Sequence, residues 1–218
     1  MISPVILGSG SPRRQFLLRE IGFDFRIIQP NVDESFPTNL RPDRVPLYLA
    51  RKKAEAIIST QELVITADTV VILGDTIFNK PAHRAEAIDM LTDLSGRTHR
   101  VITGVCLRLN EKEKLFAEES LVTFLPLSTH QITRYIDTFQ PFDKAGAYGA
   151  QDSLPSGYNP CSDQEISFLE RIQRSHLIQS SINTITEPIV LIEKIQGSYF
   201  NVMGLPIQSL YDEMRQFL

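Results

Sequence analysis

Short apolar runs separated by polar turns extend along the whole chain and predict strands and helices in a mixed order. The β-branched run Leu63–Leu73 closes at Gly74-Asp75 and predicts a hairpin that returns over Thr76–Phe78. Similar runs predict strands at Pro4–Leu7, Phe23–Ile28, His99–Leu109, Leu115–Leu125 and Ile189–Ile195, the last paired with Tyr199–Met203. Apolar residues at helical spacing predict helices capped by Ser11, Asp43 and Ser128, over Arg84–Leu94, and from Pro206. These hairpins favour a mixed sheet with packed helices over a doubly wound parallel sheet.

The bulk composition narrows the class of protein. The 218 residues suffice for one substantial core or two small lobes, and we expect a single domain over residues 1–218. The net charge of -4 lacks the basic surplus typical of nucleic-acid-binding proteins. No signal-peptide pattern is present and no apolar run approaches the ~20 residues of a membrane span, so we expect a cytoplasmic protein. Cys106 and Cys161 form no CxxC pair, which indicates free thiols and no zinc site.

The segment Ser9–Arg14 has the properties of an anion site. Its sequence SGSPRR places Ser11 at a helix N-cap position and Pro12 at the first helical position. Arg13 and Arg14 then lie in a first turn where the helix dipole disfavours cations by roughly 0.3–1 kcal/mol each. Bound phosphates would reverse that penalty. Solvation of both arginines, or pairing with acids elsewhere, is the alternative.

Asp68 interrupts the most apolar predicted strand. It shares one face with Val64, Val70 and Ile72 by period-2 alternation. A buried carboxylate needs a cation, a metal or several hydrogen-bond donors. The position therefore fits either a reacting or metal-binding carboxylate, or a structural ion pair with an Arg or Lys.

Several weaker signals point to the same chemistry. Glu34 follows a strand in an acidic loop, Lys53 ends a basic run on a helix, and Lys80 follows the hairpin. Each of the three could equally be a solvated surface charge. No Ser-His-Asp or Cys-His arrangement is evident. Carboxylates for a divalent cation, with cations for phosphates, favour metal-assisted phosphoryl chemistry over acyl transfer.

Taken together, six segments resemble the Maf family of nucleoside triphosphate pyrophosphatases. They occur in the family's order: SGSPRRQFLLREIGF, ARKKA, ADTVVILGDTIFNKP, LSGRTHRVITGV, DKAGAYGAQ and IQGSYFNVMGLP. The resemblance covers Leu7 to the C-terminus apart from one stretch. It implies an elongated α/β fold (Maf/ITPase-like) around a mixed, twisted sheet with flanking helices, usually as a homodimer. It also implies a nucleoside triphosphate as the substrate, and from the composition we expect no nucleic-acid or membrane partner.

The resemblance also implies roles for individual residues. Family members cleave a nucleoside triphosphate to the monophosphate and diphosphate with Mg2+ or Mn2+. Asp68 falls on the catalytic proton acceptor, and Asp68 and Glu34 fall on metal-binding positions. The phosphate-binding positions correspond to Ser9, Arg13, Arg14, Lys53 and Lys80.

Three positions distinguish substrate types within the family. The type that prefers dTTP and UTP has an arginine, a threonine and a glutamine, which correspond to Arg13, Thr69 and Gln151. The 7-methyl-GTP type has an aromatic residue, a Gln and a Glu at these positions. The amide of Gln151 can also donate to and accept from a pyrimidine edge. This chain therefore resembles the dTTP/UTP type.

One stretch departs from the family pattern. Residues 152–187 form an insertion, within which Ser162 and Glu165 match a capping box before an apolar helical pattern. We interpret it as a helical hairpin on the surface, a lid or part of a dimer contact. It could also support a different function, a nucleotide-sensing regulator of septum formation without catalysis. The same chemistry on 7-methyl-GTP is the other alternative.

The two arginines of the SPRR segment should be separable by substitution. Because Arg13 lies at a position that distinguishes substrate types, its exchange should alter the preference among nucleotides. Exchange of Arg14 should weaken the use of all triphosphates alike. Pyrophosphate release from a nucleotide panel measures both, and equal losses for both variants across that panel would contradict the division.

Overall fold

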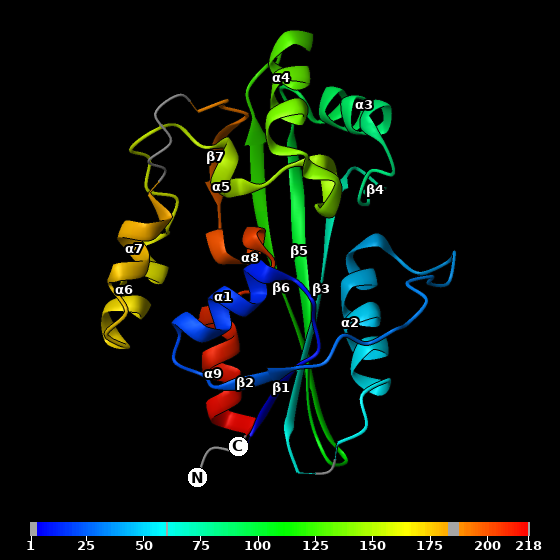
Figure 1. The fold of residues 1–218 in the computed structure, drawn as a ribbon, viewed down its shortest axis with the longest axis vertical. Coiled ribbons are helices and arrows are strands. Elements are labelled where there is room, and N and C mark those ends of the chain that lie inside the picture. The colour runs from blue at the N-terminus through cyan, green and yellow to red at the C-terminus, as the bar shows by residue number, and fades with distance from the viewer. Residues whose placement is uncertain (1–3, 60, 183–187, 218) are drawn as a thin grey trace. The chain divides into compact units, whose positions relative to one another are not determined.

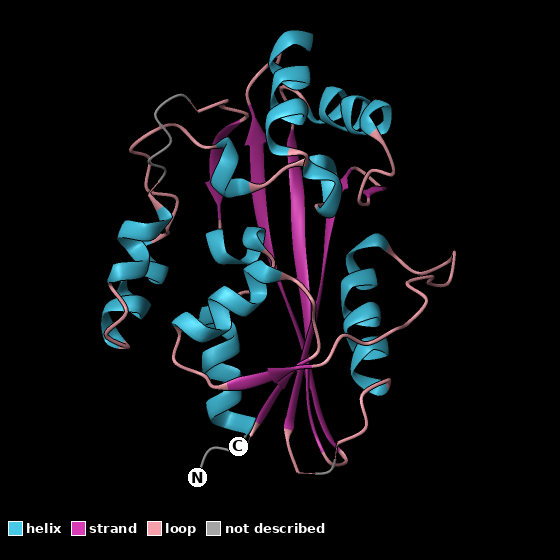
Figure 2. Ribbon diagram, in the orientation of Figure 1, coloured by secondary structure: helices cyan, strands magenta, loops and turns pink. Residues whose placement is uncertain are grey.

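A mixed sheet forms the framework of the protein, in a computed structural model that describes residues 4–59, 61–182 and 188–217. Within these ranges the strand order is β2-β1-β3-β5-β6-β7, with β4 paired to β3. β1 pairs parallel with β2 and β3, whereas the β3–β4 and β6–β7 pairs are antiparallel. The strands, coloured magenta in Figure 2, are β1 (Val5–Leu7), β2 (Phe25–Ile27), β3 (Leu63–Leu73), β4 (Thr76–Phe78), β5 (Thr98–Leu109), β6 (Lys112–Phe124) and β7 (Ile192–Gln196). The predicted mixed α/β architecture is confirmed.

Helices connect and follow these strands, and none in the described ranges is long and apolar enough to cross a membrane. The α-helices labelled in Figure 1 are α1 (Pro12–Glu20), α2 (Val45–Glu55), α3 (Arg84–Leu94), α4 (Thr129–Phe139), α5 (Ala150–Ser153), α6 (Asp163–Arg171), α7 (His176–Ser181), α8 (Tyr199–Met203) and α9 (Ile207–Phe217). Short 3-10 helices are η1 (Pro42–Arg44), η2 (Pro141–Asp143) and η3 (Ala145–Ala147).

The chain divides into two compact units. Unit 1 comprises Met1–Thr69, Ile102–Glu118 and Phe200–Leu218. Unit 2 comprises Val70–Val101 and Glu119–Tyr199. The long strands β3, β5 and β6 each supply residues to both units.

Two predicted elements are wrong. Tyr199–Met203 is the helix α8, not a strand, because Gly197 turns the chain at a φ of 107° and the Tyr199 N–H donates to the Glu165 carboxylate at 3.2 Å. Asp43 does not cap the following helix. It lies inside η1, where its carboxylate pairs with Arg41 at 2.9 Å, and Arg44 occupies the N-cap of α2. In both places a contact with another side chain, Glu165 or Arg41, decides the structure against the sequence pattern.

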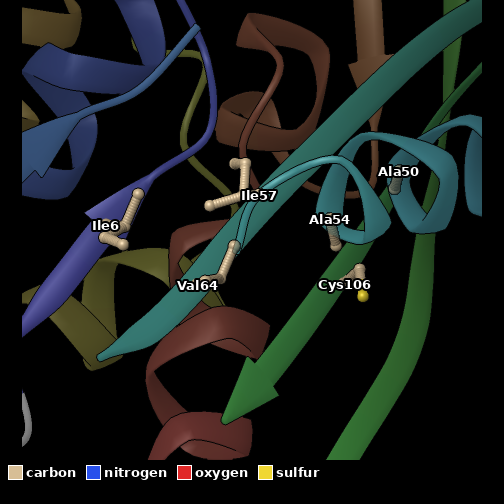
Figure 3. Packing of buried hydrophobic residues seen from close by; sticks show 6 residues of the cluster. All are labelled: Ile6, Ala50, Ala54, Ile57, Val64 and Cys106. Carbon is tan, nitrogen blue, oxygen red and sulfur yellow. The ribbon is translucent and has the colours of Figure 1, made fainter. Parts of the chain in front are cut away.

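The core of unit 1 joins α2 to the sheet. Ile6 of β1, Val64 of β3 and Cys106 of β5 pack with Ala50 and Ala54 of α2, as Figure 3 shows, in a cluster completed by Ile57. All six side chains are almost completely buried. Small alanines on the inner face of α2 let the helix lie close to the strands, and this packing positions the Lys53 end of the helix.

Gly104 of β5 marks a close approach of α2. A Cβ atom added at Gly104 would lie 2.5 Å from the Leu47 nitrogen and 2.5 Å from the Pro46 carbonyl carbon. Backbone atoms of a packed helix cannot yield easily, so any side chain at this position would push α2 from the sheet.

Gly104→Ala should therefore destabilise the fold by about 3 kcal/mol, the upper end of the range for overpacked cores. Gly74→Ala is the control, because Gly74 has a φ of 59° but nothing within 4 Å of an added Cβ. The control should lose only about 1 kcal/mol, from its left-handed backbone. Urea unfolding of both variants measures the difference, and equal losses would contradict the close approach.

Three aromatic rings fill part of the core of unit 2. The His99 ring meets Phe124 edge to face at 4.9 Å and Tyr148 at 5.4 Å between centroids. His99 Nε2 lies 2.8 Å from the Tyr148 hydroxyl, and His99 Nδ1 is buried with no hydrogen-bond partner among the described residues. Burial lowers the pKa of His99 to about 3. The imidazole is therefore neutral, which suits its aromatic surroundings.

This buried histidine predicts an acid-sensitive fold. The unfolded chain protonates His99 near its ordinary pKa of ~6.5, whereas the folded chain does so only near 3. The unfolded state thus binds the extra proton between these values, and His99 should remove about 2 kcal/mol of stability between pH 7 and pH 5. His99→Gln should show a shallower decline in urea unfolding over that pH range. His130→Gln, at an exposed position of α4, should keep the wild-type dependence. Parallel curves for all three proteins would refute the prediction.

Candidate active site

The turn from β1 into α1 lies against β3. The Gly8 N–H donates to the Ile65 carbonyl at 2.7 Å, which fixes the turn to the neighbouring strand. Ser11 occupies the N-cap position as predicted, but its hydroxyl does not cap the helix. Instead the Ser11 N–H donates to Ser9 Oγ at 3.2 Å. The first turn of α1 contains no acidic residue, so no carboxylate of that turn offsets the positive end of the helix dipole.

Arg14 is surrounded by oxygen atoms of unit 1. Its Nε donates to the Gly204 carbonyl at 2.7 Å, and its Nη1 donates to the Ala67 carbonyl at 2.8 Å and to Ser9 Oγ at 3.3 Å. Its Nη2 donates to Thr69 Oγ1 at 3.0 Å. Burial lowers the pKa of Arg14 and nearby Asp68 opposes this shift, so the guanidinium remains charged at neutral pH. The expected alternatives of a solvated or acid-paired side chain therefore do not describe Arg14, which binds mainly neutral oxygens of the chain.

The Lys53 ammonium of unit 1 forms ion pairs with two carboxylates, those of Asp68 and Glu34. The Lys53 Nζ lies 2.6 Å from Asp68 Oδ1 and 2.8 Å from Glu34 Oε1. The side chains of Lys53 and Asp68 are only 11% and 12% exposed, whereas that of Glu34 is 53% exposed. Burial raises the pKa of Asp68, although Lys53 and then Arg14 act in the opposite direction. A buried carboxylate with a raised pKa is a better proton acceptor near neutral pH than a free one.

The position of Lys53 follows from the packing of α2. Thr66 Oγ1 of β3 donates to the Ala50 carbonyl of α2 at 2.6 Å, two residues before Asp68 along the strand. Lys53 lies in the last turn of α2, where the helix dipole favours a cation. The strand and the helix are thus connected beside the carboxylate.

The donor set at this point fits a magnesium-like ion. Two carboxylates, of Glu34 and Asp68, converge on the single cation of Lys53. The described residues contain no group of three or more His, Cys, Asp or Glu that could hold a metal by itself. Mg2+ commonly binds one or two carboxylates and completes its shell with water and substrate phosphates. Two carboxylates without a third protein ligand match that pattern.

Two buried polar residues of unit 1, Thr103 and Asn201, were not predicted from the sequence. Thr103 Oγ1 lies 2.9 Å from the hydroxyl oxygen of the predicted residue Thr69, and it donates to the Asn201 carbonyl at 3.0 Å. The Thr103 N–H also donates to Asn201 Oδ1 at 3.1 Å. Thr103 and Asn201 are both completely buried polar residues. Their place in apolar segments was the available signal, but only the fold shows their partners.

The remaining predicted residues, Lys80 and Gln151, lie in unit 2. Lys80 is exposed after β4, and Gln151 is half-buried in α5. The Gly146 N–H donates to the Asn79 carbonyl at 3.1 Å, which connects the loop before Gln151 to the residue before Lys80. This loop is further held at Gly149, whose N–H donates to the Tyr135 hydroxyl at 2.9 Å. The surroundings of Lys80 and Gln151 are therefore connected within unit 2.

The segment after Gln151 contains the predicted helical hairpin. Ser162 and Glu165 form the expected capping box at the start of α6, and α6 contacts α7. Glu165 is buried, and its carboxylate also accepts from Ser198 Oγ at 2.7 Å and from the Tyr199 N–H. The hairpin is thus attached to the start of α8. Residues 183–187 of the predicted insertion lie outside the described residues.

Comparison with known proteins supports the resemblance. The family model described as "Maf-like protein" matches residues 4–156. A "dTTP/UTP pyrophosphatase" of Porphyromonas gingivalis is 41% identical over 221 residues, covering 98% of this chain and 94% of the relative. Proteins of the same name from Bacteroides fragilis and Cytophaga hutchinsonii are each 41% identical, covering 97% of this chain and 95% and 83% of the relatives. With a family match over more than half of its length and relatives aligned over nearly all of it, the chain belongs to the Maf family.

Proposed function

We propose that this protein hydrolyses dTTP and UTP to the monophosphate and diphosphate with a divalent metal ion. The single observation that carries the proposal is the cluster around Asp68, where a buried carboxylate meets Lys53 at 2.6 Å and lies near the half-buried Arg14. Relatives named dTTP/UTP pyrophosphatase support the choice of substrate.

In this proposal Asp68 is the proton acceptor. A water molecule attacks the α-phosphorus in line with the leaving group, and Asp68 accepts a proton from that water as the P–O bond to the diphosphate breaks. A divalent ion held by Asp68 and Glu34 would polarise the water and offset phosphate charge. The raised pKa of Asp68 suits proton transfer near neutral pH.

The cations of the site bind and orient the phosphates. Ser9 and the N–H groups at the start of α1 offer hydrogen bonds to anionic oxygens. Arg13 adds a guanidinium in the same turn, and Lys53 can exchange its contact with Asp68 for a phosphate oxygen. Arg14 adds positive charge beside Asp68, as its electrostatic effect on that carboxyl group indicates. The resemblance adds Lys80 as a further phosphate ligand. Developing charge on the leaving diphosphate is thereby offset.

In this proposal, the three positions that distinguish substrate types give the site its preference for a pyrimidine. Arg13 and Thr69 of unit 1 and Gln151 of unit 2 all match the dTTP/UTP type. The Gln151 amide has the donor and acceptor that a pyrimidine edge requires. The resemblance further supports a cytoplasmic homodimer that acts on free nucleotides.

A nucleotide panel tests the substrate assignment. Purified protein with Mg2+ or Mn2+ should release pyrophosphate from dTTP and UTP faster than from CTP, ITP or 7-methyl-GTP. Pyrophosphate rather than orthophosphate is expected because the α–β bond is cleaved. Fastest turnover of 7-methyl-GTP would reassign the substrate type. Binding of dTTP without metal-dependent pyrophosphate release would favour a nucleotide-sensing regulator.

Asp68→Asn should reduce kcat/KM for dTTP by about a thousandfold, within the range for loss of a general base. The fold should persist, because Lys53 keeps its ion pair with Glu34 at 2.8 Å. Asp75→Asn, in the exposed turn between β3 and β4, is the matched control and should retain wild-type activity. Pyrophosphate release and thermal unfolding measure both variants. Wild-type turnover by a folded Asp68→Asn variant would remove Asp68 from its assigned role.

A further inference from the structure

A ring of hydrogen bonds passes through Arg14 in unit 1 and is closed by the backbone of Gly204. From Arg14 it runs through the hydroxyls of Thr69 and Thr103 to the carbonyl of Asn201. The Gly204 N–H donates to that same carbonyl at 2.9 Å, and the Gly204 carbonyl accepts from Arg14 Nε at 2.7 Å. Residues from α1, β3, β5 and the end of α8 are thereby connected in one circuit.

The direction of each hydrogen bond in the ring is determined. A carbonyl cannot donate, so the single hydroxyl proton of Thr103 goes to Asn201. Thr69 must then donate its own proton to Thr103, and Thr69 Oγ1 accepts from Arg14 Nη2. The chain of donors runs one way from the guanidinium to the Asn201 carbonyl. Hydrogen bonds in such chains polarise and strengthen one another.

The ring brackets Asp68. Arg14 binds the carbonyl of Ala67 and the hydroxyl of Thr69, the residues on either side of Asp68 in β3. A guanidinium held at both neighbours of the carboxylate is fixed in direction, and it fixes the strand in return. Thr103 and Asn201 complete the ring, although neither is a charged group.

We propose that Thr103 and Asn201 are positioning residues, which orient Arg14 beside Asp68 through the hydroxyl of Thr69. The inference rests on the proposed function and adds two residues to it. The Thr69 proton is committed to Thr103, so through this hydroxyl Thr69 acts on the bound phosphates by way of Arg14.

Thr103→Val tests the ring because it removes the hydroxyl while nearly keeping the shape of the side chain. Without the Thr103 hydroxyl, Thr69 has no acceptor for its proton, and the hydroxyl that Arg14 binds is no longer fixed in direction. We expect kcat/KM for dTTP to fall about tenfold, as for a lost hydrogen bond linked to a charged group. KM for dTTP should rise in Thr103→Val and in Thr69→Val, because a misplaced Arg14 binds the phosphates less well. A loss of folded protein would lower the apparent kcat and leave KM unchanged.

Three further variants make the test specific. Thr103→Ser restores the hydroxyl and should recover most of the activity. Thr98→Val removes a hydroxyl–hydroxyl bond of the same length, 2.9 Å to Thr123, from an exposed part of β5, and should change nothing. In the Thr69→Val background, Thr103→Val should have little additional effect, because both act on one ring.

The outcomes separate the inference from the proposed function. If the wild type cleaves dTTP while Thr103→Val keeps wild-type kcat/KM and KM, the positioning role is wrong and the function stands. If the wild type releases no pyrophosphate, calorimetric binding of dTTP replaces turnover, and Thr103→Val should bind about tenfold more weakly. Equal binding by the two proteins, or none by either, would overturn the inference.

Discussion

The partial burial of Arg14 is the constraint on which the rest of the site depends. A cation withdrawn from water is tolerated only if its N–H groups find oxygen partners, and here the partners come from segments far apart in the chain. Ser9 belongs to the turn after β1, Ala67 and Thr69 to β3, and Gly204 to the end of α8. One side chain therefore determines how these segments meet. It also explains why Arg14 lies in the first turn of a helix despite the unfavourable dipole.

The same constraint determines the electrostatics at Asp68. Lys53 and Arg14 act on the carboxylate from α2 and α1, but burial outweighs them and raises its pKa. The two cations thus hold the Asp68 carboxylate in place, and the carboxylate still accepts a proton because burial keeps its pKa raised. Polyphosphate binding and proton transfer need this combination of fixed positive charge and a carboxylate that still accepts a proton.

Long-range hydrogen bonds also decide structure away from the site. Glu165 caps α6 and, with the same carboxylate, accepts the N–H of Tyr199 at the start of α8. Tyr199–Met203 has the aromatic and β-branched composition of a strand, yet this contact and the turn at Gly197 start a helix there. The carboxylate that begins the inserted hairpin therefore also helps to determine the segment that carries Asn201 and Gly204.

The sequence by itself determined the elements whose signals are local. The β-branched run of β3, its two-residue turn at Gly74-Asp75, the helix Arg84–Leu94 and the Ser128 and Ser162 caps all depend on neighbours within a few residues. A carboxylate in an apolar strand likewise marked Asp68 as unusual. The tertiary structure decided its partner Lys53, the Gly204 carbonyl 190 residues from Arg14, and the link from Thr69 through Thr103 to Asn201. Hydrogen bonds and ion pairs between distant segments leave no periodic trace in the chain, because they depend on where packing brings each segment.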